Sequence, residues 1–189
     1  MVERDSAWLC RIEAAFLFAG FLLAPILAQA EVVDSSGTGF TVRTTLAIQA
    51  PPDEVYRKFI RNIGDWWSPE HAFSGNSHNL SIEEKAAGCF CEKLPNGGGV
   101  RHMEVVNLAP GKAVTLSGAL GPLQSLAATG SLTVQFSPSE GGTKLTANYA
   151  VAGYLPGGMN TLASPVDAVI AEQFTRLKNY VLHGDASAK

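Results

Sequence analysis

The hairpin over residues 88–106 carries the side chains best suited to acid–base chemistry. Glu92, His102 and Glu104 occur on its two arms, close in sequence to the apolar Phe90. Partial burial raises carboxylate pKa values and brings histidine toward function at neutral pH. Such a group can relay a proton, orient one polar group of a ligand, or supply oxygen and nitrogen ligands to a metal. A self-satisfied ion pair at the rim is the structural alternative. No recognisable metal spacing accompanies the group, so we predict no metal and treat the three residues only as catalytic candidates.

The register of the hairpin decides which groups meet, because a slip of one residue exchanges the two faces. With a five-residue loop at 95–99, Glu92 faces His102 and Phe90 faces Glu104. We favour this register because it keeps the basic residues of both arms together on the wet face. It places all three candidates on the inner face.

Two cysteines lie on the same arm. Cys89 and Cys91 are two apart on a strand and project to one face. In the other register, with a four-residue loop, they face Glu104 and His102. An oxidising compartment would allow a small-loop disulfide, although a flat strand places the two Cα atoms near the upper limit for a bridge. We expect paired thiols or a strained, reducible bridge, and not an active redox centre.

A second group of side chains suits an apolar ligand. Trp66 and Trp67 are adjacent on a turn, so they cannot both face the same way, and one is expected at a pocket entrance. His71 and His78 follow in a Ser-, Asn- and Gly-rich loop and are expected to be solvated. The full set of predicted ligand contacts is Trp66, Trp67, Phe90, Glu92, His102, Glu104, Leu120, Tyr149 and Phe174.

Strands and one long helix must position these groups. Residues 40–48 alternate apolar and polar side chains, which predicts a half-buried strand, and the segment after Pro51-Pro52 predicts one or two short helices. Val166, Phe174 and Val181 belong to a pattern of period three to four, behind a Ser164 cap, that predicts one amphipathic helix. Six further strands are predicted between turn signals, at 80–85, 89–94, 100–108, 113–118, 127–137 and 143–151.

The first thirty residues differ from the rest. The run from Ala14 to Leu27 is uncharged, follows two arginines and leads into Ala28-Gln29-Ala30, the pattern that a signal peptidase cleaves. The run is short for a membrane span and contains Pro25, so we predict a cleaved signal peptide at 1–30 and no stable membrane anchor. The product would be periplasmic or secreted. We further expect a linker at 31–39, a ligand-binding domain at 40–184 and a frayed tail at 185–189.

Composition limits the classes of protein. The chain has 189 residues, 46% of them hydrophobic, and 17 acidic against 14 basic side chains. This describes one ordinary globular domain, and it excludes disordered, collagenous and coiled-coil proteins. Without surplus positive charge, nucleic-acid binding is not expected.

Several motifs carry a resemblance to a known superfamily. They are the segments 50–56 (APPDEVY), 66–71 (WWSPEH), 88–92 (GCFCE), 110–112 (PGK), 117–123 (SGALGPL), 142–145 (GTKL) and the C-terminal helix. Over residues 40–181 the chain resembles the START-like, birch-pollen-allergen-like SRPBCC superfamily, and is most similar to its bacterial polyketide-cyclase/dehydrase and lipid-transport-like branch. The resemblance implies the α+β helix-grip fold, a curved antiparallel sheet of about seven strands wrapped around a long C-terminal helix.

The expected function follows from the cavity that such a fold encloses. We predict an exported carrier or sensor of a hydrophobic or amphipathic small molecule of lipid, polyketide or aromatic type, with no cofactor. One alternative is a cyclase- or dehydratase-like enzyme in which Glu92 and His102 transfer protons. Another is a structural or protein-interaction domain. The sequence indicates neither the ligand nor an oligomeric state.

Overall fold

The computed structural model describes residues 29–188 of the chain. The predicted signal peptide lies outside these residues, apart from Gln29 and Ala30. Within the described range no helix is long and apolar enough to cross a bilayer.

Eight strands and three α-helices follow one another within residues 29–188. The strands are β1 (Gln29–Ser36), β2 (Gly39–Ile48), β3 (Leu80–Ile82), β4 (Cys89–Lys93), β5 (Gly99–Ala109), β6 (Ala113–Ser117), β7 (Ala127–Ser139) and β8 (Gly142–Tyr154). The helices are α1 (Pro52–Arg61), α2 (Ile63–Trp66) and α3 (Ala163–His183). Short 3₁₀ turns occupy Pro69–His71, Ser77–Asn79, Pro95–Gly97, Gly121–Ser125 and Met159–Leu162.

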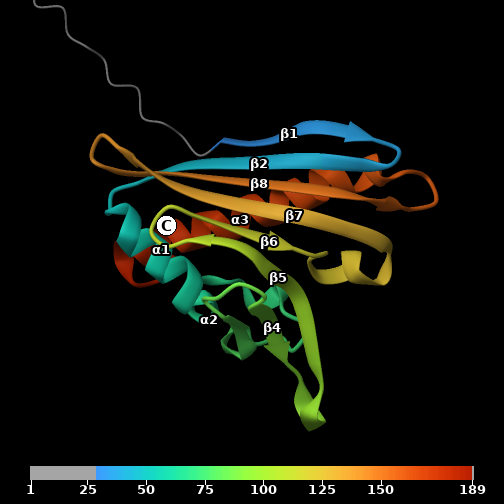
Figure 1. Ribbon diagram of the computed structural model, residues 1–189, viewed down its shortest axis with the longest axis horizontal. Helices are drawn as coiled ribbons and strands as arrows, with labels where there is room; N and C mark the ends of the chain where they lie inside the picture. Colours follow the sequence, from blue (N-terminus) through green and yellow to red (C-terminus); the bar gives the residue numbers. More distant parts are fainter. Residues whose placement is uncertain (1–28, 189) are drawn as a thin grey trace, which may run out of the picture.

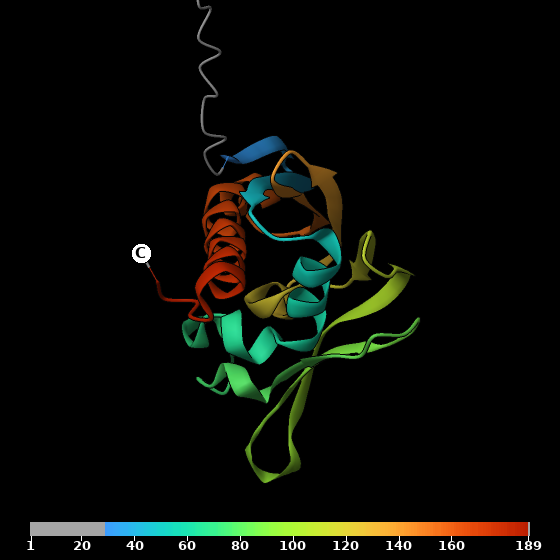
Figure 2. The same ribbon diagram turned by 90° about the vertical axis from the view of Figure 1, so that its left-hand side faces the viewer.

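All eight strands form one antiparallel sheet in the order β1-β2-β8-β7-β6-β5-β4-β3. The long helix α3 runs behind the long strands in Figure 1, and Figure 2 shows it beside the sheet with α1 and α2 toward the β4–β5 end. The sheet is open. The predicted α+β architecture, a sheet wrapped against a C-terminal helix, is confirmed with one more strand than expected.

The periodicities of the sequence explain which faces are buried. Strand β2 alternates half-buried and buried positions along its whole length, as its alternating side chains predict. Helix α3 turns Ile170, Phe174 and Leu177 inward. Gly184 ends the helix in the left-handed conformation, at φ 71°, which glycine adopts without a steric penalty.

Aromatic rings fill the space between α1, α2 and α3. The Phe59 ring stacks on Trp66 and on Phe174, with centroid distances of 5.7 and 6.2 Å. Phe136 from β7 packs against the same Phe59 ring at 5.7 Å. Trp66 and Phe174 are therefore core residues.

Two segments expected to be irregular are ordered. Residues 29–36 form β1, which pairs with β2, where a linker was expected over 31–39. All eight residues of β1 are exposed, so no buried face marks it in the sequence. The expected frayed tail is also wrong for residues 185–188: Ala186 is buried, and Asn179 donates a hydrogen bond of 2.7 Å to the Ala188 carbonyl.

Candidate functional site

The β4–β5 hairpin follows the second expected register, that of the four-residue loop, only as far as Phe90, and neither register describes the rest. Cys89 pairs with Glu104, but beyond Phe90 the register shifts, and Cys91 pairs with Arg101. His102 is the extra residue of a β-bulge on β5. A bulge inserts one residue into one strand and redirects its side chains. It allows His102 and its successor Met103 both to be buried, which a regular strand with one wet face does not permit.

The bulge brings the predicted acid–base pair together by a route that the expected register did not contain. Glu92 and His102 are buried, with relative exposures of 1% and 4%. His102 Nε2 lies 3.0 Å from Glu92 Oε2. Glu104 does not join them: it lies on the outer face and forms an ion pair of 3.1 Å with Arg101. The predicted Glu-His-Glu group is therefore wrong in its third member.

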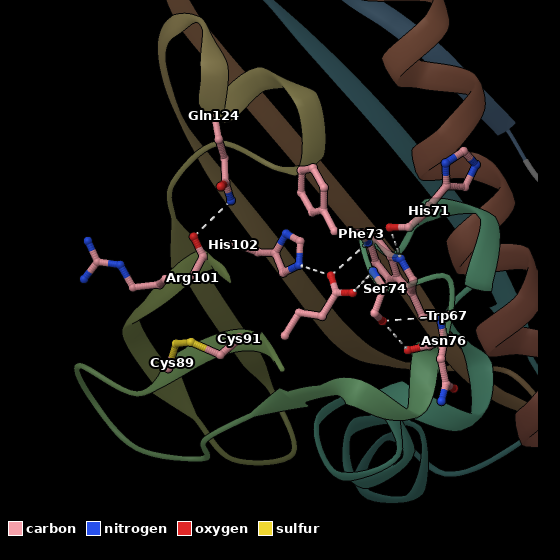
Figure 3. Close-up of polar contacts among 11 residues, drawn as sticks. Trp67, His71, Phe73, Ser74, Asn76, Cys89, Cys91, Arg101, His102 and Gln124 are labelled. Carbon is pink, nitrogen blue, oxygen red and sulfur yellow. Dashed lines mark hydrogen bonds and ion pairs between the residues drawn. A yellow bond between two sulfur atoms is a disulfide. The ribbon is translucent and has the colours of Figure 1, made fainter. Parts of the chain in front are cut away.

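Two backbone amides complete the environment of Glu92. Phe73 N–H donates to Glu92 Oε2 at 3.0 Å, and Ser74 N–H donates to Oε1 at 2.5 Å. The Phe73 ring also stacks over the His102 ring, with centroids 5.8 Å apart (Figure 3). The loop at 73–74 therefore holds the carboxylate in place. Sequence reasoning missed this loop, because backbone donors have no residue signature.

The two buried groups carry different charges at neutral pH. Burial alone would raise the pKa of Glu92, but the hydrogen bonds that the carboxylate accepts lower it below its usual value. Burial lowers the pKa of His102, and the neighbouring Glu92 only partly opposes this. Glu92 is then ionised and His102 neutral. Because an ionised carboxylate only accepts hydrogen bonds, the imidazole proton lies on Nε2 and the lone pair lies on Nδ1.

That lone pair is the free acceptor of the site. Among the described residues His102 Nδ1 has no hydrogen-bond partner, and Figure 3 shows it on the edge of the ring away from the contact of Nε2. His102 also lines a cavity. The Glu92 carboxylate thus orients the His102 imidazole through Nε2 and leaves Nδ1 able to accept a proton or a hydrogen bond.

The cavity lies between the sheet, the turn at Gly121–Ser125 and the start of α3. Its volume is about 420 Å³, within the range of small-molecule sites. Most of its wall is apolar. The lining residues are Trp67, Glu70, His71, Ala72, Phe73, His102, Leu120, Gly121, Pro122, Leu123, Tyr149, Leu162, Pro165, Val166, Val169 and Ile170.

Tyr149 contributes a second polar group to this wall. Its hydroxyl oxygen accepts a hydrogen bond of 3.0 Å from the Leu120 amide. Burial raises the pKa of Tyr149 to about 12, so the hydroxyl keeps its proton at neutral pH. The Leu120 amide already donates to the oxygen, which leaves the hydroxyl hydrogen available as a donor. His102 and Tyr149 thus supply an acceptor and a donor to a wall that also includes Glu70 and His71.

The rim of the cavity is formed by the loop after α2. The Trp67 indole N–H donates to the His71 carbonyl at 3.1 Å, and the His71 ring lies 3.3 Å from Glu172 on α3. The His71 side chain is 32% exposed, so it is only partly solvated, contrary to the expectation. His78 is 70% exposed, as expected.

The predicted ligand contacts divide into four that line the cavity and five that do not. Those in its wall are Trp67, His102, Leu120 and Tyr149. Glu92 lies behind His102, and Glu104 lies on the outer face. The other three, Trp66, Phe90 and Phe174, are buried core residues. The cavity was expected between the sheet and the C-terminal helix, and Val166 and Ile170 of α3 line it. These two residues were not among the named contacts, because helical periodicity does not tell core contact from cavity contact.

The cysteines lie on the outer face of β4. A disulfide joins Cys89 to Cys91, whose Cα atoms are 5.3 Å apart (Figure 3). Both residues are half-buried. The expected pairing of the two sulfurs is therefore present in the structure.

Gly118 packs against the bulge. A Cβ at Gly118 would lie 2.7 Å from the His102 carbonyl oxygen and 2.9 Å from Met103 Cα. Glycine is needed here because the β6 end approaches the bulged backbone closely. The chain then forms the 3₁₀ turn Gly121–Ser125, whose first residues line the cavity.

Comparisons with known proteins show the fold alone. No family model and no curated protein matches the chain. A conserved protein of unknown function from Enterococcus faecalis, EF2215, is 18% identical, with a TM-score of 0.57 over 85% of this chain and 80% of its own. CalU16 from Micromonospora echinospora is 14% identical, with a TM-score of 0.53 over 84% of this chain and 85% of its own.

A third similar structure is DynU16, a protein of the dynemicin biosynthetic locus. It is 17% identical, with a TM-score of 0.54 over 79% of this chain and 49% of its own. All three identities are low. The chain therefore shares one sheet-and-helix fold with these proteins, a likeness consistent with the helix-grip arrangement.

Proposed function

We propose that the chain binds a small amphipathic molecule whose apolar body fills the cavity and whose hydroxyl-type group donates a hydrogen bond to His102 Nδ1. The observation that carries the proposal is the contact of His102 Nε2 with Glu92, which leaves Nδ1 without a partner among the described residues, on a ring that lines a mostly apolar cavity. A ligand that donates a hydrogen bond to this nitrogen inside a mostly apolar cavity gains affinity from it.

The apolar wall supports a ligand of lipid, polyketide or aromatic type. A few polar groups in a mostly apolar cavity are the usual pattern of small-molecule sites. The resemblance of the sequence to the polyketide-cyclase and lipid-transport-like branch, and the locus of the similar DynU16, agree with this class. The Tyr149 hydroxyl would donate to a second oxygen of the ligand.

Export belongs to the same proposal. Cleavage after Ala30 would shorten β1 by Gln29 and Ala30 but leave Glu31, whose carboxylate forms an ion pair of 3.2 Å with Arg43. N-terminal sequencing of protein recovered outside the cytoplasm tests this. A first residue of Glu31 is expected, and retention of residues 1–30 would contradict it.

Two experiments test ligand binding. Native mass spectrometry of protein purified from its own source should show a bound small molecule.

Affinities for two probes of similar shape, 1-naphthol and 1-methylnaphthalene, should then be compared between the unaltered protein and His102→Phe. We expect the variant to lower the affinity for 1-naphthol by about three- to tenfold, the value of one hydrogen bond, and to change the affinity for 1-methylnaphthalene by less than about twofold. Glu104→Gln, on the outer face, is the control. Equal effects on both probes would contradict the role of His102, and failure of both probes to bind would contradict an accessible cavity.

A second function, proton transfer by an enzyme, is favoured by the same geometry. A carboxylate that orients an imidazole is a common form of general base. If a reaction occurs, Glu92→Gln should leave binding largely intact and lower turnover by about 10²–10⁴. In a carrier the same change should weaken 1-naphthol binding by no more than the roughly three- to tenfold expected for His102→Phe, because Glu92 orients His102 and does not line the cavity.

A further inference from the structure

The Cys89–Cys91 disulfide joins two residues of a single strand. It connects no two elements of the fold, and the loop that it closes contains only three residues. The stabilisation that a disulfide gains by restricting the unfolded chain is smallest for the shortest loops. The effect of this bridge is therefore local to β4.

Locally the bridge shortens the strand. The Cα atoms of Cys89 and Cys91 are 5.3 Å apart, whereas residues two apart on a regular strand are about 6.6 Å apart. The shortened segment lies opposite the bulge of β5. Three residues of β4, 89–91, face the four residues 101–104 of β5. The bridge therefore shortens β4 at the position where the bulge adds a residue to β5.

The acid–base pair lies at that point on the opposite face. Glu92 directly follows Cys91, and His102 is the bulged residue. Their contact is 3.0 Å, and a hydrogen bond is largely lost once the atoms separate beyond about 3.5 Å. A change of about an ångström in the length of 89–91 is therefore large enough to break it.

The bridge is placed where a thiol can reach it. Both cysteines are half-buried on the outer face, and Arg101, the cross-strand partner of Cys91, has a side chain that is 68% exposed. Arg101 is ion-paired with Glu104, the cross-strand partner of Cys89, so the charges beside the bridge are balanced. Figure 3 shows the disulfide on one arm of the hairpin and Arg101 with His102 on the other.

We propose that Cys89–Cys91 is a site of thiol–disulfide exchange whose substrate is a small dithiol or thiol reductant, and that its redox state controls the Glu92–His102 contact. A thiolate attacks one sulfur, the Cys89–Cys91 bond breaks, and a mixed disulfide forms. A second thiol then releases the reductant as its own disulfide. Two electrons and two protons pass to the protein, which holds two thiols. Reduction lengthens β4 and separates Glu92 from His102. Only the expected effect on ligand affinity rests on the proposed function; the exchange and the control of the Glu92–His102 contact do not.

The test compares the full chain before and after treatment with dithiothreitol. Thiol titration should show two new thiols, and the mass should rise by two hydrogens. Side-chain ¹⁵N NMR should show a change in the His102 ring signals without any ligand, and affinity for 1-naphthol should fall by about three- to tenfold. The double variant Cys89→Ser/Cys91→Ser should match the reduced protein and not respond to dithiothreitol. If this variant does not fold, the reduced unaltered protein supplies the same comparison.

The outcomes are distinct. A bridge that resists excess dithiothreitol overturns the exchange site. Two new thiols with unchanged His102 signals overturn the control of the pair. Changed His102 signals with no 1-naphthol binding in either state uphold this inference while contradicting the proposed function.

Discussion

Replacing Glu92 by glutamine tests the buried pair at the level of stability. The carboxylate accepts hydrogen bonds from His102 and from the amides of Phe73 and Ser74, with both oxygens in use. Glutamine has one acceptor oxygen and one NH₂ group, so at least one buried N–H then faces another donor. An unsatisfied buried donor costs about 1–3 kcal/mol, and the remaining bonds lose their charge assistance. We therefore expect the free energy of unfolding to fall by about 2–5 kcal/mol.

Urea denaturation at neutral pH measures this loss, with Glu104→Gln as the matched control. Glu104 lies on the same hairpin, but its side chain is 40% exposed and its ion pair with Arg101 is a surface pair. Such pairs contribute about 0–1 kcal/mol. The reasoning is refuted if Glu92→Gln stays within about 0.5 kcal/mol of the unaltered protein, or if both variants lose the same amount.

Three further predictions concern the core, the cavity wall and pH. Phe174→Ala should lower the free energy of unfolding, measured by heat or urea, by about 3–5 kcal/mol, because the ring fills the core. The affinity for 1-naphthol should change by less than about twofold, because the ring does not line the cavity. Tyr149→Phe removes the acceptor of the Leu120 amide, so hydrogen exchange of that amide should become faster, and an unchanged rate would contradict the bond. Folding lowers the pKa values of both Glu92 and His102, so the unfolded chain binds more protons in acid. Unfolding free energy should therefore fall as pH drops below about 6.5, and further below about 4.3, and His102→Phe should lack the upper part of this slope.

The strands and the long helix were predictable because each has one buried face. Alternation over 40–48 and the three-to-four spacing of Phe174 and its neighbours follow from which side of an element meets the core. Strand β1 was not predictable on this basis, because all of it is exposed. Its pairing with β2 comes from backbone hydrogen bonds, which any sequence can form.

The site was predictable in its residue types and not in its geometry. Glu92 and His102 were expected to meet, and they do, but through a bulge that places Glu104 on the other face. A bulge adds one residue without a distinctive side chain, so no pattern of apolar residues reveals it. The amides of the 73–74 loop could not be predicted for a similar reason, because every residue except proline carries a backbone N–H donor.

Side-chain ¹⁵N NMR of His102 tests the central claim most directly. At neutral pH the free protein should show Nε2 protonated and Nδ1 bare, because the ionised Glu92 holds the proton on the nitrogen that faces it. Addition of 1-naphthol should shift the Nδ1 signal in the direction of an accepted hydrogen bond, whereas 1-methylnaphthalene should leave it in place. A ring protonated on both nitrogens or on Nδ1 alone, or an Nδ1 signal that responds equally to both probes, would contradict the account.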